Sequence, residues 1–425
     1  MRPALRRTAT LAHQTQPNAV AGAESSCSVW PGGAGGRGRS APFDPNGDTP
    51  VRTVPTLGDD WRMSALNQPD SNSHAVPDSW GTFDCAVVGG GPGGLSAAVC
   101  LGRMRRRVLV IDDRDGRSLW SQINRNYLGF PDGIPAAEIR LQGRRQAARY
   151  GATFLLGRVT AADRDGDLFR LLVEGDATGG AGVDGAGTDA NVARDEELGR
   201  SLGEIQAGHS QEVIARSVIL ATGVRDPFPR FPGRDDCVGR SLFWCIACDG
   251  YEAIGRSVGV VGHDEEAVEM ALDLLDFTPK VTIAAGRSGG FTVPDSRLAD
   301  LASNGIAAYH WPVTSYPNED GQIRALVLGD PKKTSVPVDM VFTSHTPTAR
   351  NEVARQLGVE LNELGHIVVN TEQHTNVPGL YAAGDATSLH DHQVSAAVHE
   401  GNQAACAANY YLYRPVQRAP DQVEC

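Results

Sequence analysis

The chain has 425 residues, and its 39 lysines and arginines against 51 aspartates and glutamates give a formal net charge of −12. This acidic balance argues against partners such as nucleic acid or an anionic membrane surface, which need clustered basic side chains. With 41% hydrophobic residues, the chain can bury a sizeable core. No apolar run approaches the roughly 18 residues that cross a bilayer, so we expect a soluble protein without a membrane partner.

Residues 1–80 are expected to form a disordered N-terminal extension. They are rich in Gly, Pro, Ser and Arg without a hydrophobic period, so they bury too little apolar surface to become ordered. Residues 1–40 carry five arginines against Glu24 alone, which is similar in charge to a targeting segment but lacks an amphipathic helix. Whether residues 1–62 are such a segment stays open, and we favour a translation start at Met63.

Regular structure is expected from Phe83 onward. The residues Cys85-Ala-Val-Val88 predict a buried strand, which runs into the glycine-rich turn Gly89–Gly94. A helix is predicted from Leu95 to about Met104, and a second strand covers Val108–Asp112. This order of strand, turn, helix and strand is one βαβ unit.

The glycine-rich turn predicts a dinucleotide site. Gly89, Gly91 and Gly94 have the spacing of a dinucleotide-binding turn, and Asp112 lies where a ribose-binding carboxylate is expected. Glycines let the backbone approach a pyrophosphate, which the N–H groups of the following helix bind. We assign the ribose contact to Asp112 because the adjacent Asp113 should point away.

A second βαβ unit follows in the middle of the chain. Before it, β-rich stretches are expected at 152–160, 168–173 and 213–220, with a flexible surface insertion near 176–210. The second unit comprises the strand Ser257–Val261, a helix from Glu265 to Phe277 and the strand Val281–Ala285. The chain then returns through Leu380–Asp385 to a long final helix at about 394–412. Two such units predict an α/β protein with two related domains.

The cysteines predict one redox pair. Eight cysteines in a chain of this length are too few and too irregularly spaced for a disulfide framework, so we expect a reducing, cytoplasmic location. Cys245 and Cys248 have the spacing that closes a short disulfide, and Asp249 can shuttle a proton beside them. A zinc half-site is the alternative reading, but a second CxxC or a paired histidine cluster is missing and we predict no metal. The role of the terminal Cys425 stays open.

From these motifs and their order, the chain resembles the low-molecular-weight thioredoxin reductases over nearly all of residues 83–412. Trp244-Cys-Ile-Ala-Cys-Asp-Gly250 resembles the segment that carries the family's redox disulfide. The resemblance implies that Cys245 attacks the partner disulfide, that Cys248 faces the flavin and that Asp249 is the acid. It also implies FAD as cofactor, a homodimer, and a thioredoxin-like protein or a small dithiol or disulfide as partner.

Further segments resemble the family's flavin contacts. Asn126 begins a segment that is similar to the flavin-contacting Asn segment, and Ala221-Thr222-Gly223 is similar to the family's mid-chain turn. Gly384-Asp385 resembles the segment whose carboxylate binds the ribityl chain, and His392-Gln393 stands where the family usually has Arg-Gln against the flavin. The family's flavin-proximal Gly-Gly-Gln is replaced near Gly116-Arg117-Ser118. These departures are expected to tune the flavin without abolishing its binding.

The resemblance also implies a fold and a division of the chain. We expect two Rossmann-like nucleotide-binding domains, each a three-layer ββα unit, with the second inserted in the first. The expected divisions are the N-terminal extension 1–80, the first part of the FAD-binding domain 81–226, the inserted domain 227–343 with the CxxC, and the second part of the FAD-binding domain 344–425.

The largest departures from the family lie where it binds NADPH. The second glycine-rich turn reads Gly262-His-Asp-Glu-Glu-Ala267, so that Asp264 replaces the central glycine and two glutamates follow. Where the family carries His-Arg-Arg for the 2′-phosphate, this chain has Ala285-Gly286-Arg287. Negative charge beside a pyrophosphate opposes binding, so the pattern makes NADPH a doubtful donor and leaves a ferredoxin or another flavin as candidates.

Three alternatives stay open. Backbone groups could still hold NADPH, which would make the chain an ordinary NADPH-dependent thioredoxin reductase. An oxygen-dependent dithiol oxidase is the second alternative, but its relatives tend to place His after the second cysteine, whereas this chain has Asp249. A flavin-bearing redox sensor without turnover is the third, and such a module would not need Cys245, Cys248 and Asp249.

Overall fold

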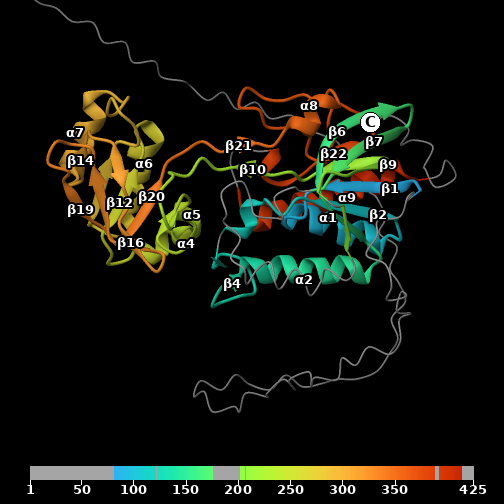
Figure 1. Ribbon diagram of the computed structural model, residues 1–425, viewed down its shortest axis with the longest axis horizontal. Coiled ribbons are helices and arrows are strands. Elements are labelled where there is room, and N and C mark those ends of the chain that lie inside the picture. The colour runs from blue at the N-terminus through green and yellow to red at the C-terminus, as the bar shows by residue number, and fades with distance from the viewer. Residues whose placement is uncertain (1–80, 121, 176–201, 206, 388–391, 414–425) are drawn as a thin grey trace, which may run out of the picture. The chain divides into compact units, whose positions relative to one another are not determined.

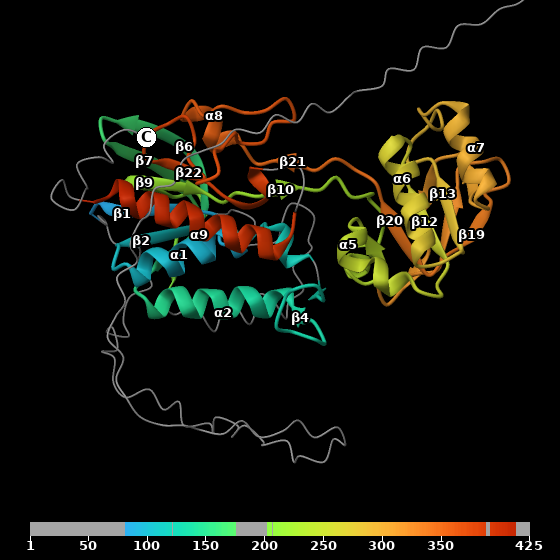
Figure 2. The ribbon, with the colours of Figure 1, turned by 180° about the vertical axis from the view of Figure 1, so that it is seen from behind.

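The computed structural model describes residues 81–120, 122–175, 202–205, 207–387 and 392–413 (Figures 1 and 2). The expectations for residues 1–80, for most of the insertion near 176–210 and for Cys425 lie outside these ranges. Within them, the chain forms two sheets built around parallel strands, each covered by helices. None of the helices in the described ranges is both long enough and apolar enough to cross a bilayer.

The larger sheet has eight strands in the described part of the chain, in the order β6-β7-β9-β1-β2-β5-β8, with β22 beside β9. Its central strands β1 and β2 are almost wholly buried and mainly apolar, as parallel strands covered on both faces require. The strands are β1 (Phe83–Val88), β2 (Val108–Asp112), β5 (Thr153–Leu156), β6 (Arg158–Asp165), β7 (Leu168–Glu174), β8 (Leu202–Glu204), β9 (Ser210–Leu220) and β22 (Leu380–Ala382).

Helices α1 (Pro92–Arg103) and α9 (Val394–Tyr411) cover one face of this sheet, and α2 (Ala136–Arg149) packs against α1 (Figures 1 and 2). The backbones of α1 and α9 touch, since a Cβ added to Gly401 would lie 2.0 Å from the carbonyl oxygen of Gly93. The short helix α8 (Glu352–Gln356) contributes to the core on the opposite face.

The smaller sheet has five parallel strands in the described residues, in the order β11-β20-β12-β13-β14. Helices α6 and α7 cover one face, and the antiparallel strands β15, β18 and β19 cover the other, so that two apolar cores enclose the sheet. The elements are β11 (Leu242–Phe243), β12 (Val258–Val261), α6 (Glu265–Asp273), η4 (Leu274–Asp276), β13 (Val281–Ala284), α7 (Asp295–Ser303), β14 (Ala307–Tyr309), β15 (Val313–Ser315), β18 (Ala325–Leu328), β19 (Ser335–Pro337) and β20 (Met340–Thr343).

Two segments connect the sheets, and they pair with each other. In this antiparallel ribbon, Val224 pairs with Ala349 and Arg225 with Thr348 (Figure 1). The remaining short elements are η1 (Arg117–Leu119), β3 (Ile123–Asn124), β4 (Ile134–Pro135), β10 (Val224–Arg225), α4 (Arg234–Cys237), α5 (Ile246–Asp249), η3 (Gly250–Ala253), β16 (Asn318–Glu319), β17 (Gln322–Ile323), β21 (Thr348–Ala349) and η5 (Gly384–Ala386).

The expected α/β fold with two Rossmann-like, three-layer units is confirmed. All strands of the smaller sheet come from the middle of the chain, while the larger sheet takes strands from both sides of that segment. The stated limits of the domains stay a prediction. The expectation of a loop near 176–210 is wrong for Leu202–Glu204, which form β8 and pair in parallel with Phe154–Leu156 at the open edge of the sheet.

Candidate redox and dinucleotide site

Cys245 and Cys248 are joined in a disulfide at the beginning of α5, directly after β11. Cys245 precedes the first turn of α5 in an extended conformation, and its sulfur accepts a hydrogen bond from the amide of Cys248 at 3.1 Å. This short helix sets the two sulfurs on one side of a tight turn. The predicted redox pair is therefore assembled, and its chemical roles stay predictions.

The disulfide lies beside two of the predicted flavin contacts. Gln393 Nε2 lies 3.3 Å from Cys248 Sγ and 3.7 Å from Cys245 Sγ, and Gln393 Oε1 accepts a hydrogen bond from Asn126 Nδ2 at 2.7 Å. Gln393 precedes α9, whereas Asn126 comes from the loop between β3 and β4. Cys248, but not Cys245, lines a cavity of about 100 Å³ together with Asn126, Gln393 and Asp385. Of the two sulfur-bearing residues, Cys248 is thus the one on the wall of this cavity, and its role as the flavin-facing thiol stays a prediction.

Asp249 lines the same cavity and is only 8% exposed. Burial, helped by the negative charge of Glu252 and opposed by Arg125, raises the pKa of its carboxyl group to about 7. Arg125 Nε contacts Glu252 Oε1 at 3.1 Å, which places the opposing charges close together. A carboxyl group with a pKa near 7 can hold and release a proton beside the disulfide at neutral pH.

The glycine-rich turn has the geometry that a dinucleotide needs. A Cβ on Gly89 would lie 2.1 Å from the carbonyl oxygen of Ala221, and a Cβ on Gly94 would lie 1.9 Å from the carbonyl oxygen of Gly89. At Gly91, by contrast, a Cβ would meet nothing closer than Ser118 Oγ at 3.8 Å. Gly89 and Gly94 are therefore required by backbone packing, while Gly91 borders open space for a ligand.

The surroundings of this turn fit FAD. No side chain of the described residues caps the N-terminus of α1, so its amides are available to a pyrophosphate. A cavity of about 280 Å³ begins at the turn and is lined by Gly89, Thr222 and Arg350, among others. Ala221 donates its amide proton to the carbonyl oxygen of Val88 at 2.8 Å, which holds the predicted segment 221–223 beside β1.

Asp112 and Asp113 face different surroundings. The Asp112 carboxylate accepts hydrogen bonds from Arg140 Nη2 at 2.8 Å and from Arg144, both on α2. Burial works against its charge, but the two arginines outweigh burial and lower the pKa of Asp112 to about 2. Asp113 lines the 280 Å³ cavity and contacts Arg158 Nη2 at 3.0 Å. Asp113 therefore does not point away as expected, and the ribose contact of Asp112 stays a prediction.

Arg117 joins several predicted flavin contacts, although no sequence motif singled it out for a role. Its guanidinium pairs with both carboxylate oxygens of Asp226, and Nη1 donates to Asp385 at 3.2 Å and to His392 Nδ1 at 2.8 Å. The adjacent Gly384 has a φ of +75°, a conformation that favours glycine at the turn after β22. The only sequence signal for Arg117 was its position where the family's Gly-Gly-Gln is replaced.

The second glycine-rich turn differs from the first. Asp264 caps the N-terminus of α6, where its Oδ1 accepts from the amide of Ala267 at 3.1 Å. Glu265 pairs with Arg297, whose Nη1 also contacts Asp300 at 2.8 Å. Arg287 is exposed. The first amides of α6 thus meet a carboxylate of the chain itself.

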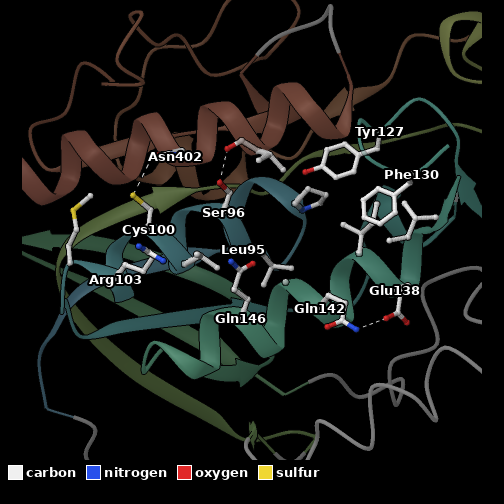
Figure 3. Close-up of a pocket in the computed structure, with 17 residues that line it drawn as sticks. Leu95, Ser96, Cys100, Arg103, Tyr127, Phe130, Glu138, Gln142, Gln146 and Asn402 are labelled. Atoms are coloured by element: carbon white, nitrogen blue, oxygen red, sulfur yellow. Dashed lines mark hydrogen bonds between the residues drawn. The ribbon is translucent and has the colours of Figure 1, made fainter. Parts of the chain in front are cut away.

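A larger, mainly apolar cavity of about 880 Å³ lies between α1, α2 and α9 (Figure 3). Figure 3 shows Tyr127 and Phe130 at one end of it and Cys100 and Asn402 at the other. Pro92 lines both this cavity and the one that contains Cys248, so the two cavities adjoin at the N-terminus of α1.

The comparisons with known proteins agree with this geometry. The family model for pyridine nucleotide-disulphide oxidoreductases matches residues 83–401. The chain is 26% identical over 357 residues to the thioredoxin reductase of Aquifex aeolicus, which covers 82% of this chain and 96% of that relative. It is also similar to the solved structure of HlmI, with 28% identity, a TM-score of 0.64 and coverage of 79% of this chain and 93% of that one.

A thioredoxin reductase structure from Streptococcus pyogenes covers 79% of this chain and 99% of its own, with a TM-score of 0.65 and 21% identity, and supports the fold. The matched family model spans both sheets, the glycine-rich turn and the CxxC pair. The chain belongs to the pyridine nucleotide-disulphide oxidoreductase family, as a thioredoxin reductase-like, FAD-dependent disulfide oxidoreductase.

Proposed function

We propose that the protein passes electrons between FAD and the Cys245–Cys248 disulfide, and from there to a thioredoxin-like protein or to a small dithiol or disulfide. The observation that carries this proposal is the contact of Gln393 Nε2 with Cys248 Sγ at 3.3 Å. It joins the redox pair to a residue that the resemblance assigns to the flavin. A sulfur that exchanges electrons with a cofactor has to lie at its edge, and Cys248 lines the cavity that we propose for the flavin ring.

The chain's own residues supply the thiol chemistry. In the reducing direction, the Cys245 thiolate attacks one sulfur of the partner disulfide, which forms a mixed disulfide and releases the other partner sulfur as a thiolate. Asp249 gives its proton to that leaving sulfur. Cys248 then attacks the sulfur of Cys245, which releases the second partner thiol and closes the Cys245–Cys248 disulfide. Bound FAD, once reduced by the electron donor, would supply the two electrons that return this pair to the dithiol.

This proposal is tested with anaerobically photoreduced, FAD-loaded protein and an oxidised thioredoxin. Newly formed thioredoxin thiols should appear with the parent chain and should be absent with Cys245→Ser, while both proteins keep their FAD. Asp132→Asn, on an exposed loop, is the matched control and should behave as the parent does. Thiol formation by Cys245→Ser at the parent's rate would refute the assignment.

We further propose that NADPH is not the physiological electron donor and that a ferredoxin or another flavin has this role. The N-termini of helices α1 and α6, which both follow glycine-rich turns, differ in a way that supports this proposal. The N-terminus of α1 has no side-chain cap in the described residues, whereas Asp264 caps α6 and places a carboxylate where a pyrophosphate would bind. Glu265 and Glu266 add charge in the first turn of α6. The side chains that bind the 2′-phosphate in the family are missing at Ala285 and Gly286. If the Asp264 cap, the added glutamate charge and this missing clamp each weaken binding about tenfold, NADPH affinity falls roughly a thousandfold.

The donor is identified by anaerobic mixing of the flavoprotein with NADPH, NADH, reduced ferredoxin or a reduced flavin while the visible flavin band is followed. NADPH should bleach this band slowly or not at all. The combined variant Asp264→Gly, Ala285→His and Gly286→Arg should respond to NADPH where the parent does not. Rapid bleaching of the parent by micromolar NADPH would favour an ordinary NADPH-dependent thioredoxin reductase instead.

A dithiol oxidase that delivers its electrons to oxygen is the second candidate function. The 880 Å³ cavity favours it, because a mainly apolar space that adjoins the redox cavity suits a small substrate better than a protein. Val99→Trp, which narrows this cavity, should raise KM for a small apolar dithiol without changing exchange with thioredoxin. An unchanged KM would remove the argument for this candidate.

The resemblance to thioredoxin reductases also supports a homodimer, which light scattering of the purified protein tests. The cytoplasmic location expected from the cysteine content is part of the same proposal. A redox sensor without turnover would fail the thiol-formation assay even in its parent form.

A further inference from the structure

Arg117 places a buried positive charge on the wall of the redox cavity. It stands at the beginning of η1, soon after β2, and its side chain is 13% exposed. It lines the same 100 Å³ cavity as Cys248 and Asp385. A flavin that fills this cavity beside Cys248 would therefore lie next to the guanidinium.

The carboxylate of Asp226, on the segment that follows β10, binds the guanidinium of Arg117. Arg117 Nε donates to Asp226 Oδ2 at 2.7 Å, and Nη2 donates to Oδ1, so that the pair is bidentate. The Asp226 side chain is 1% exposed, and His345 Nε2 lies 3.2 Å from its Oδ1. Burial opposes both charges, but each stabilises the other, so that the pKa of Asp226 falls to about 2 and that of Arg117 rises. Both groups stay charged at neutral pH.

The third guanidinium nitrogen of Arg117, Nη1, binds two predicted flavin contacts. Its Nη1 donates to Asp385 Oδ2 at 3.2 Å and to His392 Nδ1 at 2.8 Å. Arginine has donors only, so His392 Nδ1 is the acceptor and its ring is oriented by this bond. Arg117 thus connects a buried carboxylate behind the cavity with the side chains that face it.

We propose that Arg117 is a positioning residue that orients Asp385 and His392 and, together with Asp226, sets the reduction potential of bound FAD. This rests on the proposed function, in which FAD exchanges electrons with the Cys245–Cys248 pair. Reduction by two electrons places negative charge on the flavin ring. A guanidinium beside the ring favours that charge, and the carboxylate of Asp226 partly cancels the effect.

The two partners of the ion pair therefore have opposite effects on the potential. Arg117→Gln removes the cation and leaves the carboxylates of Asp226 and Asp385, so the potential should fall. Asp226→Asn keeps the cation and removes one anion, so the potential should rise. We expect each change to shift the equilibrium constant for FAD reduction by about tenfold, which equals about 30 mV for a two-electron couple.

The test is the midpoint potential of bound FAD, measured by anaerobic equilibration with reference dyes, together with the dissociation constant of FAD from the apoprotein. Arg170→Gln on β7 is the control, because this arginine is 41% exposed in its side chain, pairs with Asp165 and Glu212, and lies outside the cavity. It should leave both quantities unchanged. Arg117→Gln should also weaken FAD binding, because Asp385 and His392 lose the donor that orients them.

Arg117→Gln leaves Asp226 buried without its cation and can misfold. The double variant Arg117→Gln/Asp226→Asn has neither charge, and its potential should lie below that of Asp226→Asn alone. Equal potentials in these two variants, or shifts of the same sign in both single variants, would overturn the proposal. Dye equilibration does not require thiol exchange, so a parent protein that fails the thioredoxin assay would sink the proposed function without affecting this test.

Discussion

Replacement of Asp249 by Asn should stabilise the fold at alkaline pH while it impairs thiol exchange. The Asp249 carboxyl group has a pKa of about 7 in the folded protein, against an ordinary value of 3.8, chiefly because it is buried. An acid with a raised folded-state pKa binds its proton more tightly in the folded chain. Its contribution therefore favours folding at low pH, and stability is lost as pH rises between about 4 and 7.

The size of this effect follows from the same pKa values. The difference between 3.8 and about 7 corresponds to a loss on the order of 4 kcal/mol in unfolding free energy above pH 7. The neutral amide of Asp249→Asn avoids this loss. At pH 8 the variant should unfold at higher urea concentration than the parent, and at pH 4 the two should unfold together. Asp132→Asn, at an exposed position, should match the parent at both pH values.

The activity of the same variant separates a proton donor from a merely buried carboxyl group. Exchange with oxidised thioredoxin should fall by about 10²-fold or more in Asp249→Asn, because a positioned acid typically contributes that much. In the parent, exchange should decline as pH rises through 7, where Asp249 loses its proton. A variant that is no more stable than the parent at pH 8, and that keeps full exchange, would refute the reasoning about this residue.

Three further changes test other parts of the structure. Gly94→Ala should purify largely without FAD, because its Cβ would lie 1.9 Å from a carbonyl oxygen of the same turn, and a full flavin absorbance would contradict this. Asp112→Asn should lower the unfolding free energy of the apoprotein in urea by about 3 kcal/mol, because two buried arginines lose their shared anion; a loss under about 1 kcal/mol would argue against that pairing. Glu252→Gln removes a negative charge near Asp249, so the alkaline limb of the exchange profile should move to lower pH, and an unmoved limb would count against this coupling.

The sequence predicts the parts of the fold that carry strong local patterns. β1, β2, α6 and α9 agree with their expected segments because apolar runs and glycine-rich turns mark them. Helix α2 was not predicted. It has a weak apolar pattern because it buries Arg140 and Arg144, which a reading by hydrophobic period places on the surface.

The candidate site also contains residues that the sequence identifies and residues that only the fold brings together. The Cys245–Cys248 pair and the glycine-rich turn follow from residue type and spacing, since neighbours in sequence form them. Arg117 and Asp226 are separated by 109 positions, so only the folded chain brings them together. The sequence favoured Asp112 over Asp113 without a basis for the direction of either carboxylate, which depends on the arginines of α2 and on Arg158.

The central claim is that electrons pass between the Cys245–Cys248 pair and FAD. Anaerobic titration of the FAD-loaded protein with a small dithiol, followed at the visible flavin band, tests it most directly. The parent band should bleach, and the Cys248→Ser band, at equal FAD content, should not. Bleaching of Cys248→Ser at the rate of the parent would contradict it.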